Sequence, residues 1–143
     1  MIADDIVGRW NIVSWFQLYD DGRRQAPLGE NLDGFIRYTP DGDMVCMIAN
    51  ADLPDFVSGG QWNASEAERA KAYSSMLAYA GKWRIEGDGI VHAVEQSLFP
   101  NWKGGDQRRQ LRLEGEVLFI EARLEAGTAE ARTAQLKWQR ASA

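Results

Sequence analysis

The sequence predicts an all-β fold, an antiparallel up-and-down β-barrel of about eight strands with one helix near residues 65–80. Three observations lead to this prediction. Runs rich in β-branched and aromatic residues recur along almost the whole chain. Short turn signals such as Asp-Gly separate these runs, which is typical of neighbouring antiparallel strands. Apolar residues with helical spacing occur in one segment. The remaining strands are expected to form a closed barrel, because closure removes exposed strand edges.

Length and charge narrow the class of protein. The 143 residues hold no repeat and no linker-like run, so we expect a single domain over residues 1–143. The formal net charge of -5 argues against nucleic acid and against an anionic membrane as partners. The chain has no signal-peptide pattern, no apolar run of membrane-spanning length and a single cysteine, Cys46. We therefore expect a cytoplasmic protein with no disulfide, no metal site and no cofactor.

The first two β segments carry the clearest signals. Residues 6–19 are apolar on both faces, and a strict period of two places Trp10 and Phe16 on one face and Trp15 on the other. Residues 34–49 predict a hairpin around Thr39-Pro40-Asp41-Gly42, because proline sets φ for the first turn position and glycine accepts a positive φ after it.

A loop over residues 50–62 precedes the predicted helix. Ser65 and Glu68 have the spacing of a capping box, and Gly81 is expected to end the helix. The residues expected to dock the helix as an apolar stripe are Tyr73, Met76, Leu77 and Ala80.

After Gly81 the chain alternates apolar and polar residues in strands joined by short turns, as in an antiparallel meander. Trp83 and Ile85 share one face, and Ala134, Leu136 and Trp138 share another near the end of the chain. A barrel of about eight strands is either packed solid or just wide enough for one small ligand. This geometry predicts a binding cavity.

Four segments taken in order, "IVGRWNIVSW", "PLGENLDGFIRYTPDGDM", "AYAGKW" and "HAVEQSLFPNW", resemble the bacterial and fungal lipocalin-like domain family, a branch of the calycin β-barrels. The resemblance covers almost the whole chain and implies a barrel with a small internal cavity. Most members of the family have no assigned function, so the resemblance implies a fold more than an activity. Relatives often have a second histidine where this chain has Ala93, which argues against a mechanism that needs a histidine pair.

The strand over residues 90–98 mixes polar and apolar residues on both faces. Small residues flank Glu95, so we expect its carboxylate to point into the barrel, with Arg109 or Arg37 as its partner. This pair has three readings: a contact that fixes strand register, a polar group that orients a ligand, or a catalytic acid or base.

His92 is the single histidine of the chain, which excludes a three-histidine metal site. No His-Glu-x-x-His and no Gly-x-Ser-x-Gly motif is present. His92 is therefore either a structural or surface residue or a proton-transfer group, and Glu95 and His92 are weak catalytic candidates.

Pro100 ends this strand, and the aromatic residues beside it either plug one end of the barrel or gate it. The loop with Phe56 and Trp62, together with the helix carrying Tyr73 and Tyr79, is a candidate lid. The predicted ligand-binding residues are Trp10, Arg37, Tyr38, Tyr79, Trp83, Glu95, Ser97, Phe99, Trp102 and Arg109.

Three functions remain open at this point. The first is an intracellular barrel that binds a small apolar or amphipathic molecule. Such a barrel could also form a homodimer. The second is a barrel enzyme of the isomerase or cyclase type that uses Glu95 or His92 for proton transfer. The third is a filled structural barrel without a ligand. A cavity of at least about 300 Å³ would favour the first two.

Overall fold

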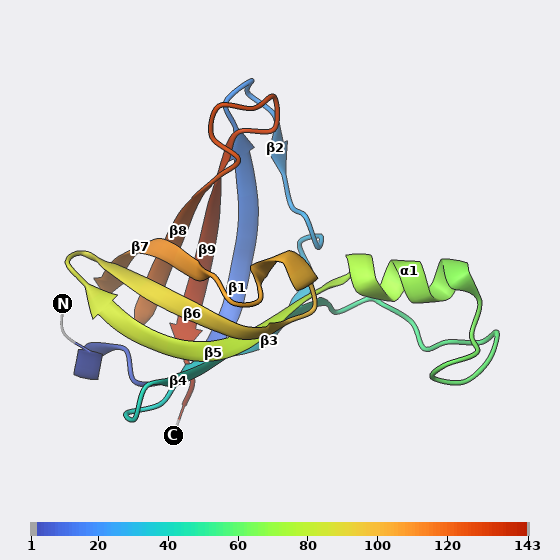
Figure 1. Ribbon diagram of the computed structural model, residues 1–143, viewed down its shortest axis with the longest axis horizontal. Coiled ribbons are helices and arrows are strands. Elements are labelled where there is room, and N and C mark those ends of the chain that lie inside the picture. Colours follow the sequence, from blue (N-terminus) through green and yellow to red (C-terminus); the bar gives the residue numbers. More distant parts are fainter. Residues whose placement is uncertain (1–2, 143) are drawn as a thin grey trace.

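The computed structural model describes residues 3–142 and confirms a closed antiparallel barrel (Figure 1). The described residues form one sheet with the strand order β2-β1-β3-β4-β5-β6-β7-β8-β9, and β1 also pairs with β9, which closes it. The short β2 pairs only with the end of β1, so the longer strands build the wall. The elements are η1 (Ala3–Asp5), β1 (Gly8–Tyr19), β2 (Arg24–Gln25), β3 (Leu32–Tyr38), β4 (Asp43–Asn50), α1 (Glu66–Ser74), β5 (Met76–Glu86), β6 (Gly89–Ser97), η2 (Pro100–Trp102), β7 (Asp106–Glu114), β8 (Val117–Leu124) and β9 (Arg132–Arg140).

The predicted hairpin is formed by β3 and β4, with Thr39 to Gly42 as its turn. Gly42 has a φ of 95°, a conformation that glycine adopts at little cost, and its N–H donates to the Thr39 carbonyl at 3.2 Å. The Thr39 hydroxyl accepts a hydrogen bond from the Asp43 N–H at 2.9 Å. Proline and glycine thus act in this turn as the sequence predicts.

A β-bulge in β1 corrects the predicted faces of the first strand. The register between β1 and β9 shifts between Ile12 and Ser14, so one extra residue is accommodated there. As a result Trp10 lies in the core before the bulge and Trp15 packs against the core after it. Phe16 stacks instead under the guanidinium of Arg24, whose Cζ atom lies 3.8 Å from the centroid of the Phe16 ring. A strict period of two was therefore wrong for this strand.

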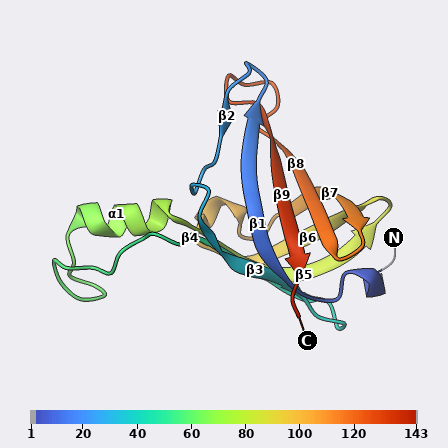
Figure 2. The same cartoon turned by 180° about the vertical axis from the view of Figure 1, so that it is seen from behind.

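The helix is shorter than predicted. Ser65 caps α1 as expected, because its hydroxyl accepts the Glu68 N–H at 3.1 Å, but the helix ends at Ser74. Residues 76–80 begin β5 and pair with β4 from Ala49 onward, because the sheet ladder and burial in the barrel outweigh the local helical spacing. None of the helix residues is buried, and α1 projects away from the barrel in both views (Figure 1, Figure 2). The predicted docking of the helix by an apolar stripe was wrong.

Gly81 has a different role from the predicted helix stop. It lies inside β5, where a Cβ atom would come within 2.0 Å of the Ala93 carbonyl oxygen on β6. The register of β5 and β6 shifts at this point, with Gly81 opposite Val94 and Ala80 opposite Gln96. Only glycine permits this close approach of the two backbones, which creates the second bulge of the barrel.

One end of the barrel is filled by large side chains. Trp10 is fully buried, and its indole N–H donates to the Ile6 carbonyl at 2.8 Å. Trp83 donates to the Thr39 carbonyl at 2.9 Å, and its ring lies 5.1 Å from that of Tyr38. The indole donors at this end are satisfied, so the residues act as a plug. Any opening must lie at the other end, near the C-terminal end of β1 and the start of β5.

Candidate ligand-binding cavity

A Tyr-His-Tyr network occupies the interior. His92 on β6 is 1% exposed, its Nε2 lies 2.8 Å from the Tyr38 hydroxyl and its Nδ1 lies 2.9 Å from the Tyr79 hydroxyl. A neutral imidazole has one N–H donor and one acceptor nitrogen, so one hydroxyl accepts from the ring and the other donates to it. Three strands, β3, β5 and β6, are held together by this pair of hydrogen bonds.

Burial keeps this network uncharged. Desolvation and, to a smaller extent, the positive charge of Arg109 lower the pKa of His92 to about 3. Desolvation also raises the pKa of the Tyr38 and Tyr79 hydroxyls well above their ordinary value. A base with so low a pKa and acids with such high ones are poorly matched to proton transfer near neutral pH.

Beside the network lies an internal cavity of about 40 Å³. Its wall is mainly aromatic and aliphatic, with four polar or ionisable side chains that include Arg109 and contain no carboxylate. The wall is formed by Trp15, Ile36, Cys46, Leu77, Tyr79, His92, Trp102, Arg109, Ile120, Ala122, Leu124, Ala134, Leu136 and Trp138.

A second, open cavity of about 250 Å³ forms the mouth of the barrel. Trp15, Leu77, Trp102 and Leu124 belong to the walls of both cavities, so these residues lie between them. Trp102 in η2 packs edge-on against Tyr79, with ring centroids 5.5 Å apart. The indole of Trp102 therefore stands between the mouth and the interior.

Two indole donors in the inner wall have no acceptor among residues 3–142. These are the buried Nε1 atoms of Trp15 and Trp138. A buried N–H without a partner costs on the order of 1–3 kcal/mol, and such groups often mark a bound water or ligand. The cavity thus offers hydrogen-bond donors that the chain itself leaves unused.

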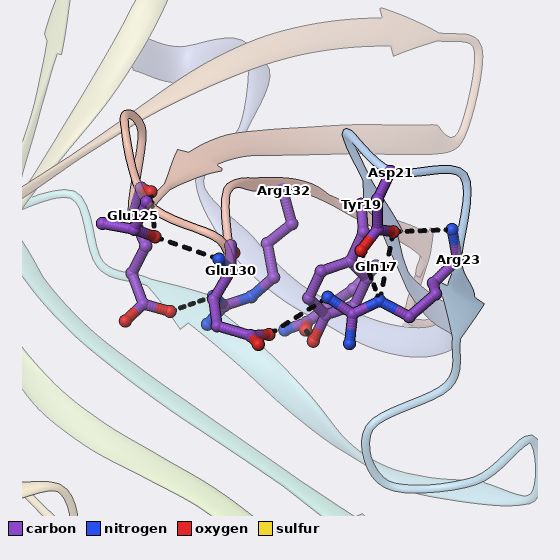
Figure 3. Close-up of polar contacts among 8 residues, drawn as sticks. Gln17, Tyr19, Asp21, Arg23, Glu125, Glu130 and Arg132 are labelled. Carbon is purple, nitrogen blue, oxygen red and sulfur yellow. Dashed lines mark hydrogen bonds and ion pairs between the residues drawn. The ribbon is translucent and has the colours of Figure 1, made fainter.

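Polar contacts fix one side of the mouth (Figure 3). In the β1–β2 turn Arg23 binds Asp21, and it reaches Glu130 in the loop between β8 and β9 with an Nη2–Oε2 distance of 3.3 Å. Arg132, which lines the mouth, pairs with Glu125 and donates to the Glu130 carbonyl at 2.9 Å. These contacts are partly solvated, so they orient the two loops more than they stabilise the fold.

Seven of the ten predicted ligand-binding residues line a cavity, contact its wall or belong to the plug. Tyr79, Trp102 and Arg109 line the inner cavity, and Phe99 lines the mouth. Tyr38 touches the site through its hydrogen bond to His92. The remaining two aromatic residues of the prediction, Trp10 and Trp83, belong to the plug at the closed end.

Three placements differ from the sequence predictions. Glu95 is exposed, because the bulge beside it leaves it outside the ladder while Val94 points into the core. Arg37 is exposed on β3 and does not face the cavity. Arg109 lies opposite Ile90 and forms no pair with Glu95.

Ser97 lies in the wall of a shallow outer groove, and its hydroxyl accepts the Phe99 N–H at 3.1 Å. In the candidate lid, Trp62 is 83% exposed, and Tyr73 belongs to the wall of the mouth.

Sequence reasoning missed several wall residues, above all Trp15, Trp138 and Cys46. Trp15 was assigned to the face opposite Trp10, and the bulge that reverses this assignment has no signature in the sequence. Trp138 shares its face with Ala134 and Leu136, as predicted, but a strand pattern cannot distinguish a plug from a cavity wall.

A closed antiparallel barrel with an apolar internal cavity defines the class of lipocalin-like β-barrels. Residues 7–141 match the family model of the lipocalin-like domain, so the chain belongs to that family. It is 30% identical over 74 residues to the 4'-hydroxy-3'-methoxypropiophenone carrier protein of Aspergillus oryzae (strain ATCC 42149 / RIB 40). The aligned region covers 46% of this chain and 62% of that protein. A crystal structure of a mutant of the fluorescent protein UnaG has a TM-score of 0.45 and 12% identity, over 98% of this chain and 99% of that chain.

Two features are absent from residues 3–142. None of their helices has the length and apolar character needed to cross a bilayer. Their His, Cys, Asp and Glu side chains form no cluster of three or more that could hold a metal ion.

Proposed function

We propose that this protein binds and carries a small apolar or amphipathic molecule inside its barrel. The observation that supports this most strongly is the internal cavity, whose apolar wall includes two indole N–H donors without acceptors. Family membership supports the same function, because lipocalin-like barrels commonly hold small hydrophobic ligands. The name of the Aspergillus relative describes a carrier of a small aromatic ketone, which belongs to the proposed class of apolar or amphipathic molecules.

Entry of a ligand requires Trp102 to move. The inner cavity of about 40 Å³ is far below the roughly 300 Å³ of ordinary ligand pockets, so taken alone it fits the filled barrel better than a carrier. The mouth of about 250 Å³ lies directly behind the same indole, so carriage requires the two spaces to join. The loop itself is anchored, because the Val94 N–H donates to the Gly105 carbonyl at 2.9 Å and the Gly104 N–H donates to the Val94 carbonyl at 2.8 Å. We therefore expect rotation of the Trp102 side chain to join the two spaces.

A second function, proton-transfer catalysis on a bound ligand, rests on the contact of His92 with the cavity. Its low pKa and its two tyrosine partners argue for a structural and recognition role, and the exposed Glu95 removes the other catalytic candidate from the interior. Carriage therefore ranks above catalysis. A cytoplasmic location remains part of the proposal.

The proposal is tested with Nile red, a neutral apolar dye whose emission rises in apolar surroundings. Ala134→Leu adds three carbon atoms to the inner wall, while Gln135→Leu adds a leucine on the outer face of the same strand. We expect wild type and Gln135→Leu to bind the dye alike and Ala134→Leu to bind it at least about ten-fold more weakly. Equal binding by all three proteins would place the dye outside the barrel and contradict the proposal.

A further inference from the structure

Arg109 connects the inside of the barrel with its outer surface. Burial alternates along β7, and the half-buried face carries Gln107, Arg109, Leu111 and Leu113. Arg109 lines the inner cavity and also an outer groove of about 540 Å³, and among residues 3–142 no other residue belongs to both walls.

The barrel wall opens at this point. β7 pairs with β8 only from Gln110 opposite Glu121 to Glu114 opposite Val117. Residues 106–109 pair with β6 alone, and residues 122–124 pair with β9 alone, so β7 and β8 part beside Arg109. Figure 1 shows the same divergence, with β8 and β9 rising away from β6 and β7. Arg109 lies beside this split and lines the space on either side of it.

The charge of Arg109 has no counterion among the described residues. Its Nη2 donates to Gln107 Oε1 at 2.8 Å and its Nη1 donates to the Arg108 carbonyl at 3.0 Å, and no described carboxylate lies within 4.0 Å. Arg112, an outward-facing arginine of the same strand, pairs with Glu114. A guanidinium has five N–H donors, so Arg109 retains three for a further partner.

The inner side of Arg109 favours an anionic partner, whereas the carboxylates of Glu86, Asp88 and Glu121 line only the outer groove. The inner wall contains no aspartate or glutamate, and the Trp15 and Trp138 indoles add two unused donors to the guanidinium. The field of Arg109 also reaches the buried network, where it adds to the lowering of the His92 pKa by burial and offsets a small part of the rise that burial causes in the pKa of Tyr38 and Tyr79. A buried or half-buried cation is normally matched by an anion, because desolvation of an unmatched charge is costly.

We propose that Arg109 is the polar anchor of the ligand and that the ligand is an apolar, aromatic molecule bearing an anionic oxygen, as in a carboxylate or a phenolate. This inference rests on the proposed carrier function and adds the chemical class of the cargo. The aromatic body lies among Trp15, Trp102 and Trp138, and the anionic oxygen accepts hydrogen bonds from the guanidinium. Neutral molecules of the same shape bind more weakly, because they leave the cation unmatched.

The test compares 2-naphthoate with the neutral 2-naphthamide, two molecules with the same aromatic body, by isothermal titration calorimetry. Arg109→Gln removes the proposed anchor. Arg112→Gln removes one positive charge from the outer face of the same strand and controls for net charge. Arg109→Lys keeps the charge without the planar guanidinium and serves if the glutamine variant does not fold.

We expect wild type and Arg112→Gln to prefer naphthoate over naphthamide by at least about ten-fold. Arg109→Gln should lose this preference but keep its affinity for naphthamide, and Arg109→Lys should show a reduced preference. Equal binding of both compounds by wild type, or an unchanged preference in Arg109→Gln, would overturn the assignment of Arg109 while leaving the carrier function standing. Binding of neither compound by wild type would instead count against the carrier function and the anchor together.

Discussion

Lowering the pH from 7 to 5 should destabilise this protein through His92 alone. Burial lowers the pKa of His92 to about 3 in the folded protein, against about 6.5 in the unfolded chain. Between these values the unfolded chain binds a proton that the folded protein does not bind, so the free energy of unfolding falls as the pH falls. Each pH unit well inside this window costs about 1.4 kcal/mol, and the sum from pH 7 to pH 5 is about 2 kcal/mol.

Few other groups interfere with this measurement. Tyr38 and Tyr79 bind His92, and Cys46 shares its cavity wall; burial raises the pKa of all three groups, which keeps them protonated between pH 5 and pH 7. Hydrogen bonds to arginine, hydroxyl or backbone donors lower the pKa of five carboxyl groups, which moves their titration further below the pH range of this measurement. They are Asp20, Asp21, Asp41, Glu68 and Glu86.

The assay is urea unfolding of wild type and His92→Gln at pH 7, 6 and 5, followed by tryptophan fluorescence and circular dichroism. Wild type should lose about 2 kcal/mol over this range, whereas His92→Gln should be less stable at pH 7 but nearly independent of pH. A flat wild-type profile, or an equal loss in the variant, would show that His92 is not held neutral by burial.

Three further predictions follow from the same contacts. Trp102→Ala should lower the free energy of unfolding by roughly 1–3 kcal/mol, because a half-buried indole is lost, but it should speed the entry of Nile red in stopped-flow mixing. Slower or unchanged entry would show that the Trp102 side chain does not block the way to the inner cavity. Gly81→Ala should lower the free energy of unfolding by several kcal/mol in chemical denaturation, because the new Cβ would meet a backbone carbonyl of β6. The control Gly115→Ala has open space around it but a φ of 59°, so it should cost only about 1 kcal/mol, and similar costs for the two variants would disprove the close approach. Ser65→Ala should speed hydrogen exchange in α1 while leaving the barrel strands unchanged, because α1 contributes no buried side chain to the core; faster exchange throughout would mean that the helix supports the barrel.

Much of the fold is predictable from the sequence because its signals are local. The turn at Thr39 to Gly42 is specified by the chemistry of proline and glycine, and over residues 110–114 of β7 burial alternates as polarity does. The prediction that Ser65 caps the helix is also correct, because a cap depends on residues close together in the sequence. The end of α1 is a different case: Met76 and Leu77 fit a helical stripe, but their long-range pairing with β4 decides their conformation.

The site is less predictable because bulges control which side chains face the interior. The shifts after Ile12 and beside Gly81 reverse the period of two, which brings Trp15 inward and leaves Glu95 outside. A buried His92 is equally hidden from sequence reasoning, since its partners come from β3 and β5, distant in the chain. Arg109 was predicted as a ligand-binding residue and does line the cavity, but its missing counterion emerges only from the three-dimensional arrangement.

Native mass spectrometry of the protein purified from its own host tests most directly whether the barrel interior holds a cargo. The account predicts a fraction of wild type and of Gln135→Leu that carries the added mass of one small molecule, and loss of this fraction in Ala134→Leu. Bare protein in all three samples, or the same added mass in Ala134→Leu, would contradict it.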